Sequence, residues 1–302
     1  MSKFSTWLRA ARLRTLPLSI SGVVVGTALA NFYGQSDNII FVLALMTTIG
    51  FQVTSNFAND YGDGVKGTDN DFRLGPQRVL QSGLLTRKEL KTGIMVSIGI
   101  NLLLILGVLY FAFGTQNLAY FALFVVLGLA SIWAAIRYTV GNSAYGYKGL
   151  GDIFVFLFFG LLAVVGTLFL YTKQFSWPAL LPACTIGLLS TGVLNLNNLR
   201  DFENDKKSGK NTLVVKMGFN YGKFYHFGLI LTAFICMLVF VVVNHSVVAQ
   251  FLPLLAFVPI AIHMMKVNHT KAPEKLDPEL KKLALSTFLM SVFFYIVFNN
   301  FL

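Results

Sequence analysis

A cluster of acidic and amide side chains near residue 60 carries the residue types best suited to chemistry in this 302-residue chain. Its members stand at i, i+3, i+4 and i+7, a spacing that places them on one face of a helix: Asn56, Asn59, Asp60 and Asp63. Asp69 follows a few residues later. The pattern predicts a helix whose end presents a stripe of oxygen ligands.

A second cluster of the same kind lies in the other half of the chain. Asn198, Asp201 and Asp205 are spaced i, i+3 and i+7, which predicts that they too share one face at the end of a helix. The two clusters share little sequence beyond Asn and Asp, so they indicate at most a weak internal repeat.

Carboxylates gathered in this way favour a divalent cation. Because like charges repel, such a cluster stays ionised only when cations neutralise it. Mg²⁺ takes one or two carboxylates and completes its shell with water and substrate phosphate oxygens. We therefore predict that all the side chains of both clusters are candidate Mg²⁺ ligands for a diphosphate-handling site. Within them, the predicted catalytic residues are Asp60, Asp63, Asp201 and Asp205.

Basic residues near the clusters could bind the phosphates of such a substrate. Arg can make bidentate contacts with phosphate, whereas Lys acts as a point charge. Arg78, Lys148 and Lys210 lie in glycine-bearing segments, and Arg200 belongs to the second cluster itself. We predict that these four residues bind the diphosphate.

The elements that must position these residues are membrane-spanning helices. Hydrophobic residues make up 55% of the chain and charged residues only 12%, whereas soluble domains carry roughly 25% charged residues. A backbone in lipid must satisfy its own hydrogen bonds, and a helix needs about 17–25 apolar residues to cross. Nine stretches approach or exceed that length: 16–33, 39–58, 92–113, 117–136, 153–172, 178–197, 224–244, 247–265 and 283–301. We predict an all-α bundle of nine transmembrane helices that forms one membrane-embedded domain over residues 1–302.

Charge orients the predicted bundle. With the N-terminus inside, the outer connections are 34–38, 114–116, 173–177 and 245–246. They contain only one of the 24 Lys and Arg residues, Lys173, and only one of the 13 acids, Asp37. This bias follows the positive-inside rule. We predict a bacterial inner-membrane protein with a cytoplasmic N-terminus, an active site facing the cytoplasm and an external C-terminus.

The same bias explains the net charge of +11, so we expect no nucleic-acid partner. The basic segment over residues 1–14 is interpreted as an interfacial amphipathic helix and not as a cleavable signal peptide. His226, His245, His263 and His269 show no metal-ligand spacing, and we interpret them as structural.

The motifs together resemble those of the UbiA superfamily of membrane prenyltransferases, and within it the MenA type, which prenylates 1,4-dihydroxy-2-naphthoate. The resemblance spans nearly the whole chain and rests, in order, on Arg12–Ser19, Asn56–Asp69, Gly75–Arg78, Gly146–Asp152, Asn197–Asp205 and Gly209–Gly218. The third acid of the first motif is Asp69, as in the MenA-type form of that motif.

The resemblance implies a reaction. A polyprenyl diphosphate would ionise with Mg²⁺ as cofactor, and an aromatic acceptor would be prenylated with loss of CO₂, giving demethylmenaquinol for menaquinone synthesis. Aromatic faces stabilise cations, so Tyr61, Tyr138, Tyr145 and Tyr147 are candidates for that role, with an interfacial aromatic belt as the equal alternative. Arg14 is a candidate for the acceptor's carboxylate, although a basic interfacial flank explains it as well.

Three other functions stay open at this point. A secondary transporter would also carry buried acids, but transporter sites lie near the bilayer midplane and not at a helix end. A CDP-alcohol phosphotransferase signature starts like Asp60–Gly64 and then breaks at Val65–Gly67. Another aromatic acceptor, such as 4-hydroxybenzoate, remains the main alternative because a few pocket residues decide it.

Overall fold

The computed structural model describes residues 2–70 and 73–299, and every regular element within these ranges is helical. Nine helical segments of this part of the chain are long and apolar enough to cross a membrane, which confirms the predicted nine-helix, all-α bundle. The last two positions of the predicted ninth stretch, 300 and 301, lie outside the described residues.

The α-helices, in chain order, are α1 (Lys3–Ala11), α2 (Leu16–Phe32), α3 (Asn38–Lys66), α4 (Arg87–Phe113), α5 (Leu118–Arg137), α6 (Gly151–Val155), α7 (Thr167–Thr172), α8 (Leu180–Arg200), α9 (Phe202–Lys207), α10 (Leu213–Met217), α11 (Phe219–Asn244), α12 (Leu252–Leu255), α13 (Phe257–His269) and α14 (Asp277–Phe298). Short 3₁₀ turns are η1 (Leu13–Thr15), η2 (Tyr145–Lys148), η4 (Val248–Phe251) and η5 (Pro273–Leu276). A π-helix, η3 (Phe156–Gly166), joins α6 to α7 within the fifth span.

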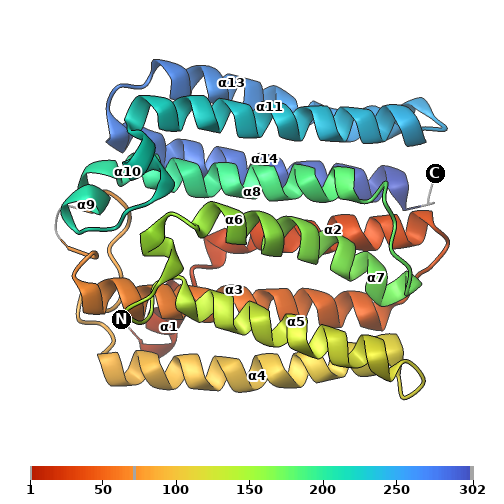
Figure 1. The fold of residues 1–302 in the computed structure, drawn as a ribbon, viewed down its shortest axis with the longest axis horizontal. Helices are drawn as coiled ribbons and strands as arrows, with labels where there is room; N and C mark the ends of the chain where they lie inside the picture. The colour runs from red at the N-terminus through yellow and green to blue at the C-terminus, as the bar shows by residue number, and fades with distance from the viewer. Residues whose placement is uncertain (1, 71–72, 300–302) are drawn as a thin grey trace.

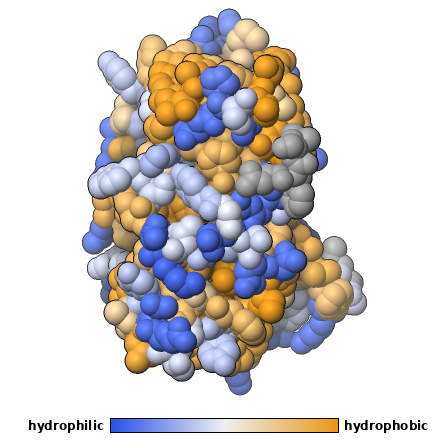
Figure 2. Space-filling model, turned by 90° about the vertical axis from the view of Figure 1, so that its right-hand side faces the viewer, coloured by the Kyte–Doolittle hydropathy of each residue, from blue (hydrophilic) through white to orange (hydrophobic). Residues whose placement is uncertain are grey.

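The long helices lie side by side along the longest axis of the molecule (Figure 1). The N-terminus, α9 and α10 lie at one end, which we call the site end, and the C-terminus lies at the other. The connections after α2, α4, α7 and α11 lie at the end opposite to the site end (Figure 1). Figure 2 views that opposite end, where hydrophilic residues form separate areas among hydrophobic ones.

The helices continue past the apolar stretches at the site end. α3 runs to Lys66, α4 starts at Arg87 and α11 starts at Phe219. The whole stripe from Asn56 to Asp63 therefore lies on one continuous helix, as its spacing predicts.

The second cluster departs from its predicted geometry. α8 ends at Arg200, Asp201 forms the joint with φ −91° and ψ 9°, and Asp205 lies on the separate short helix α9. The prediction of one straight helix face for Asn198, Asp201 and Asp205 was wrong. The chain bends here because the membrane-spanning helix has ended and α9 packs back over the site end (Figure 1).

The first span is interrupted at its start. Arg12 adopts a left-handed conformation, φ 49° and ψ 58°, and separates α1 from α2. α1 packs its Trp7 against Phe57 of α3, with ring centroids 5.3 Å apart. The predicted amphipathic segment thus contains a short helix whose Trp7, Ala10 and Ala11 pack against α3 and α4, whereas Phe4 and Leu8 are exposed.

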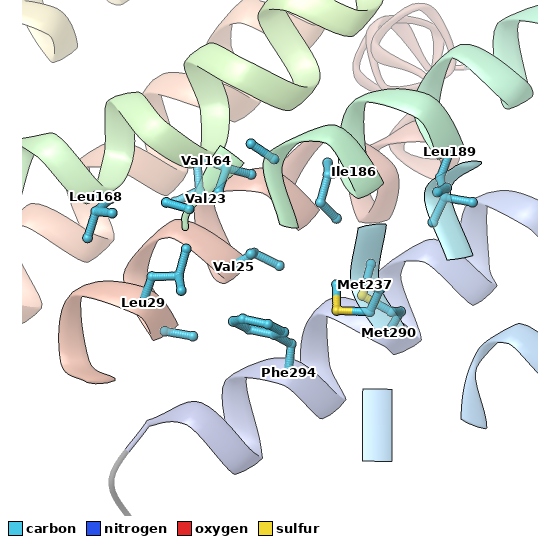
Figure 3. Close-up of a cluster of buried hydrophobic side chains, with 14 of the residues drawn as sticks. Val23, Val25, Leu29, Val164, Leu168, Ile186, Leu189, Met237, Met290 and Phe294 are labelled. Carbon is cyan, nitrogen blue, oxygen red and sulfur yellow. The ribbon is translucent and has the colours of Figure 1, made fainter. Parts of the chain in front are cut away.

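A buried apolar core fixes the helices that surround the site. Side chains of α2, the fifth span, α8, α11 and α14 meet there, among them Val23, Val164, Ile186, Met237 and Phe294 (Figure 3). Between the fifth span and α8 the backbones nearly touch, because a Cβ built on Gly160 would lie 2.5 Å from the Cα of Gly187. Small residues of this kind allow helices in lipid to pack closely.

Candidate active site

One large cavity joins the site end to the interior of the bundle. Its volume is about 990 Å³, and it lies among α2, α3, α4, α5, the fifth span, α8 and α14. Both Ala44 and Asp60 of α3 line it. They are 16 residues apart, so the cavity follows about 24 Å of helix.

The two ends of this cavity differ in chemistry. At the site end its wall carries charged side chains from both halves of the chain: Asp60, Asp63, Arg73, Arg78, Arg200, Lys210 and Asp277. Deeper in the bundle the wall is apolar and includes Val108, Phe124, Leu162 and Leu170. The cavity therefore fits a molecule with an anionic head and a long apolar tail.

Asp60 of the first cluster is buried, with 1% of its side chain exposed. Its Oδ1 accepts hydrogen bonds from Arg12 and from Arg78 Nη1, the latter at 2.7 Å. The left-handed bend at Arg12 brings this guanidinium over the end of α3. Burial lowers the pKa of Arg78 to about 10, which leaves it charged at neutral pH.

Lys210 connects the two clusters. Its Nζ lies 3.9 Å from Asp63 Oδ2 and 3.9 Å from Asp205 Oδ1. Burial alone would lower the pKa of Lys210, but the carboxylates of Asp63 and Asp205 raise it above its ordinary value. The side chain is therefore a fixed positive charge between the two halves of the chain.

Burial raises the pKa of two acids, one from each cluster. Burial and the charge of Asp63 raise the pKa of Asp69 to about 7, in spite of Arg73 Nε at 3.1 Å. Burial also raises the pKa of Asp205 to about 7. Such carboxylates would lose their protons readily to a divalent cation.

Both carboxylate oxygens of Asp201 accept hydrogen bonds from the preceding residue, Arg200. Arg200 donates from Nε to Asp201 Oδ1 at 2.9 Å and from Nη2 to Oδ2 at 2.6 Å. Burial raises the pKa of Asp201, but the hydrogen bond and charge of Arg200 outweigh it and hold that pKa below its ordinary range. Arg200 Nη1 also binds Asp277 Oδ1 of α14 at 2.6 Å.

The donor set fits Mg²⁺, which prefers oxygen ligands and keeps positions for substrate phosphate. Among the members of the two clusters, three buried groups have oxygens without a hydrogen-bond partner in the described part of the chain: Asp69, Asn198 Oδ1 and Asp205 Oδ2. Within the same ranges no three His, Cys, Asp or Glu side chains are arranged to hold a metal by themselves. A Mg²⁺ ion held by these oxygens would keep positions for water and for diphosphate oxygens.

Some predicted residues have other partners. Asn56 donates from Nδ2 to Ala11 O at 2.8 Å and accepts from Gln52 Nε2 at 3.2 Å, so its amide ties α3 to the end of α1. The Lys148 side chain is exposed outside the cavity wall, and its carbonyl accepts from Lys216 Nζ at 2.6 Å.

Of the four predicted tyrosines, two line the cavity and two do not. Tyr147 donates to Asp63 Oδ1 at 2.8 Å, and Lys66 Nζ lies 3.9 Å from its ring centroid, so one ring face already meets a cation. Tyr61 packs against the apolar cluster under α1 and does not line the cavity. Tyr138 and Tyr145 do line it.

An aromatic wall leads from the charged end into the apolar interior. Tyr138 and Tyr145 are 5.4 Å apart between centroids, Tyr145 stacks on Phe154 at 3.9 Å, and Phe158 follows at 6.1 Å. All four line the cavity. Burial raises the pKa of Tyr138 to about 12, so its phenol stays neutral.

Arg73 and Asp277 were not among the predicted site residues, and Arg12 was predicted to be part of an interfacial segment. Arg73 follows Asp69 by four residues in a loop, and Asp277 begins α14 after a basic connection. Both could have been suspected from their place beside a motif or a helix start at the site end. Arg14, a predicted residue, lines the cavity with an exposed side chain.

Comparison with known proteins gives consistent matches. The model of the UbiA prenyltransferase family matches residues 19–298. The chain is 41% identical over 297 residues to a 1,4-dihydroxy-2-naphthoate octaprenyltransferase of Haemophilus influenzae, covering 97% of this chain and 95% of that protein. It is 40% identical over 294 residues to the Escherichia coli protein of the same description, with the same coverage.

A solved structure supports the fold independently. It is a UbiA homolog from Archaeoglobus fulgidus bound to GPP and Mg²⁺, with a TM-score of 0.67 and 15% sequence identity. The match covers 97% of this chain and 99% of that chain.

Proposed function

The chain belongs to the UbiA prenyltransferase family, and we propose that it transfers a polyprenyl group from a polyprenyl diphosphate to 1,4-dihydroxy-2-naphthoate. The products are demethylmenaquinol, diphosphate and CO₂, which places the reaction in menaquinone biosynthesis. The observation that carries this proposal is the cavity that joins Asp60 and Asp63 of the first cluster, together with Arg200 and Lys210 beside the second, to a long apolar wall. The choice of acceptor rests on the naphthoate enzymes to which the chain is 40–41% identical.

The bonds balance without a separate base. The allylic C–O bond of the donor breaks, and its electron pair leaves with the diphosphate. The acceptor ring supplies the pair for the new C–C bond at the carbon that bears the carboxylate. The C–CO₂ bond then breaks and returns its pair to the ring, so that CO₂ leaves where another arene would lose a proton.

Residues of both clusters would hold Mg²⁺: Asn59, Asp60, Asp63, Asp69, Asn198, Asp201 and Asp205. When bound there, Mg²⁺ supplies Lewis-acid stabilisation of the negative charge that develops on the diphosphate. Arg78 and Lys210 lie at the same end and carry fixed positive charge toward that group. Such pre-arranged charges are typically worth a large part of catalysis.

The apolar parts of the chain orient the reacting carbon. The aromatic wall from Tyr138 to Phe158 offers ring faces to the allylic group and excludes water from it. The apolar cavity beyond it accommodates the isoprenoid tail. Arg14, on the cavity wall and exposed, is suited to meet the carboxylate of the incoming acceptor.

We propose that the site end faces the cytoplasm of a bacterial inner membrane, with the C-terminus outside. All but one of the Lys and Arg residues fall on the site side of the predicted topology, in accordance with the positive-inside rule. Labelling of single cysteines placed at Ser208 and Ser246 in intact cells tests this orientation. A membrane-impermeant maleimide should label the cysteine at position 246 and not the one at position 208. Labelling at position 208 alone would show that the topology is the reverse of the proposed one.

A transfer assay on detergent-purified protein tests the function. Octaprenyl diphosphate and Mg²⁺ are mixed with 1,4-dihydroxy-2-naphthoate or, separately, with 4-hydroxybenzoate, and product mass and CO₂ are followed. We expect prenylated naphthoquinol and CO₂, with both lost on adding EDTA and reduced at least about 100-fold by Asp60→Asn or Asp201→Asn. If product forms with 4-hydroxybenzoate and not with the naphthoate, the acceptor must be reassigned. If folded protein forms no product with either, the proposed prenyltransferase function is rejected.

A further inference from the structure

Two histidines that show no common sequence pattern lie in contact with each other outside the cavity. His226 Nε2 of α11 lies 3.0 Å from His263 Nε2 of α13, and His263 Nδ1 lies 2.9 Å from Glu279 Oε2 of α14. The exposed fractions of the two histidines are 1% and 0%. These residues join three helices at the site end, yet none of them lines the cavity (Figure 1).

The hydrogen-bond partners determine which nitrogen donates in each of these contacts. An ionised carboxylate only accepts, so His263 must donate from Nδ1 to Glu279. In a neutral imidazole the other nitrogen then accepts, so His226 must donate from Nε2. Its own Nδ1 is left as an acceptor, and that atom has no partner among the described residues. Glu279 also accepts from Lys282 Nζ at 2.6 Å.

Glu279, whose carboxylate ends this series of hydrogen bonds, lies in the first turn of α14, two residues after Asp277. From the same turn Asp277 reaches Arg200 at 2.6 Å. Arg200 in turn holds both carboxylate oxygens of Asp201. An unbroken set of contacts therefore runs from His226 to the second cluster, with the first turn of α14 as its middle.

The first turn of α14 has no side-chain cap at its N-cap position, Leu276. The Asp277 N–H donates to Glu274 O of the preceding 3₁₀ turn η5, and Pro278 adds no further N–H group that needs a partner. Side-chain contacts can therefore help to set the direction of this turn, and Glu279, which does not line the cavity, makes one of them with His263.

We propose that His263 and Glu279 are positioning residues for the second aspartate cluster. They hold the first turn of α14 in the orientation in which Asp277 binds Arg200. Arg200 is thereby held in place to donate two hydrogen bonds to the carboxylate of Asp201. The inference rests on the proposed function in one respect, namely that this cluster binds the diphosphate of the donor.

Three variants of the full-length protein test the proposal in the transfer assay. His263→Leu removes the donor to Glu279, and His263→Asn keeps an N–H close to the place of Nδ1. Thr287→Val is the matched control, because it removes another buried hydrogen bond of α14, from Thr287 Oγ1 to Leu283 O at 2.8 Å, without a link to Arg200.

We expect His263→Leu to raise the KM for the polyprenyl diphosphate on the order of tenfold. The acceptor KM and kcat should stay within about twofold of wild type. His263→Asn should restore most of the loss, and Thr287→Val should leave the donor KM unchanged. Equal donor KM values for the leucine variant and the control would overturn the proposal. Should His263→Leu fail to fold, Glu279→Asp, which shortens the anchor by one methylene, should give the same KM shift.

A double-mutant cycle tests whether His263 and Asp277 affect the donor KM through the same contacts or independently. Asp277→Asn alone should raise the donor KM to a similar extent, and His263→Leu combined with Asp277→Asn should be no worse than the worse single variant. Losses that multiply would show that the histidine acts by another route and would reject the proposal.

A binding measurement needs no turnover. Inorganic pyrophosphate with Mg²⁺ should raise the Tm of wild type and of Thr287→Val, and raise it less for His263→Leu. Equal shifts in all three would count against the positioning role. If wild type binds pyrophosphate but prenylates nothing, the proposed function fails while this comparison still decides the inference.

Discussion

Lys210 is the residue at which the two aspartate clusters meet, since its Nζ lies 3.9 Å from a carboxylate of each. A bound diphosphate would bring further negative charge to the same place. The lysine then neutralises whichever anion is nearest, and its buried ammonium group needs no reorganisation when the donor ionises. Its position depends on the bend after α9, where Lys210 N donates to Asp205 O at 2.8 Å.

We expect Lys210→Met to lower kcat/KM for the donor about 100-fold, because one fixed charge is removed from the developing diphosphate. Lys210→Arg should keep part of the activity, and Lys206→Met, an exposed lysine of α9, should stay within about twofold. Initial rates over a range of donor concentrations measure all three. Similar losses for positions 206 and 210 would mean that general surface charge matters and the specific contact does not.

At the scale of elements, the fifth span forms one wall of the cavity and is held from behind by α8. The contact depends on Gly160 and Gly187, whose backbones approach too closely for a side chain. Because backbone atoms of α8 lie on the other side, neither helix can move aside without disturbing Asn197 and Arg200 further along α8.

Gly160→Ala should therefore destabilise the protein by about 1–3 kcal/mol, the usual cost of overpacking. A Cβ there would lie 2.7 Å from Ala183 O as well as 2.5 Å from Gly187 Cα. The control is Gly99→Ala in α4, where a Cβ meets nothing within 4 Å, and we expect it to be neutral or slightly stabilising. Thermal unfolding in one detergent compares them, and equal Tm values would contradict the packing argument.

At the scale of the whole molecule, the cavity unites a charged entrance with an apolar interior that no single helix could provide. Helices from both halves of the chain contribute to its wall, and the wall changes from charged to apolar along α3 between Asp60 and Ala44. A long isoprenoid tail therefore has a path within the bundle while its diphosphate stays at the site end.

Leu162→Trp should narrow that path. Since Leu162 lines the cavity, we expect the larger ring to lower kcat/KM for octaprenyl diphosphate about tenfold. Geranyl diphosphate, with a much shorter tail, should lose less. Leu157→Trp, on an exposed position of the same π-helix, is the control. Equal losses for the long and short donors would show that the tail does not pass Leu162.

Local rules of sequence are enough to predict the class of the fold and the helical stripe of the first cluster. Apolar length decides what can cross a bilayer, and helical spacing decides which side chains share a face, so nine spans and the stripe from Asn56 to Asp63 follow from local rules. The motif set also identified the family, because six ordered segments are far more specific than one aspartate pair.

Which charged side chains meet is apparent only from the packing of the helices. That Lys210 lies between Asp63 and Asp205, that Arg12 turns onto Asp60, and that the second cluster bends at Asp201 depend on how separate helices pack. The same holds for His226 and His263, which are 37 residues apart and have no sequence pattern in common. Periodicity describes one helix at a time, whereas these contacts arise between helices, where packing geometry and loop bends set the distances.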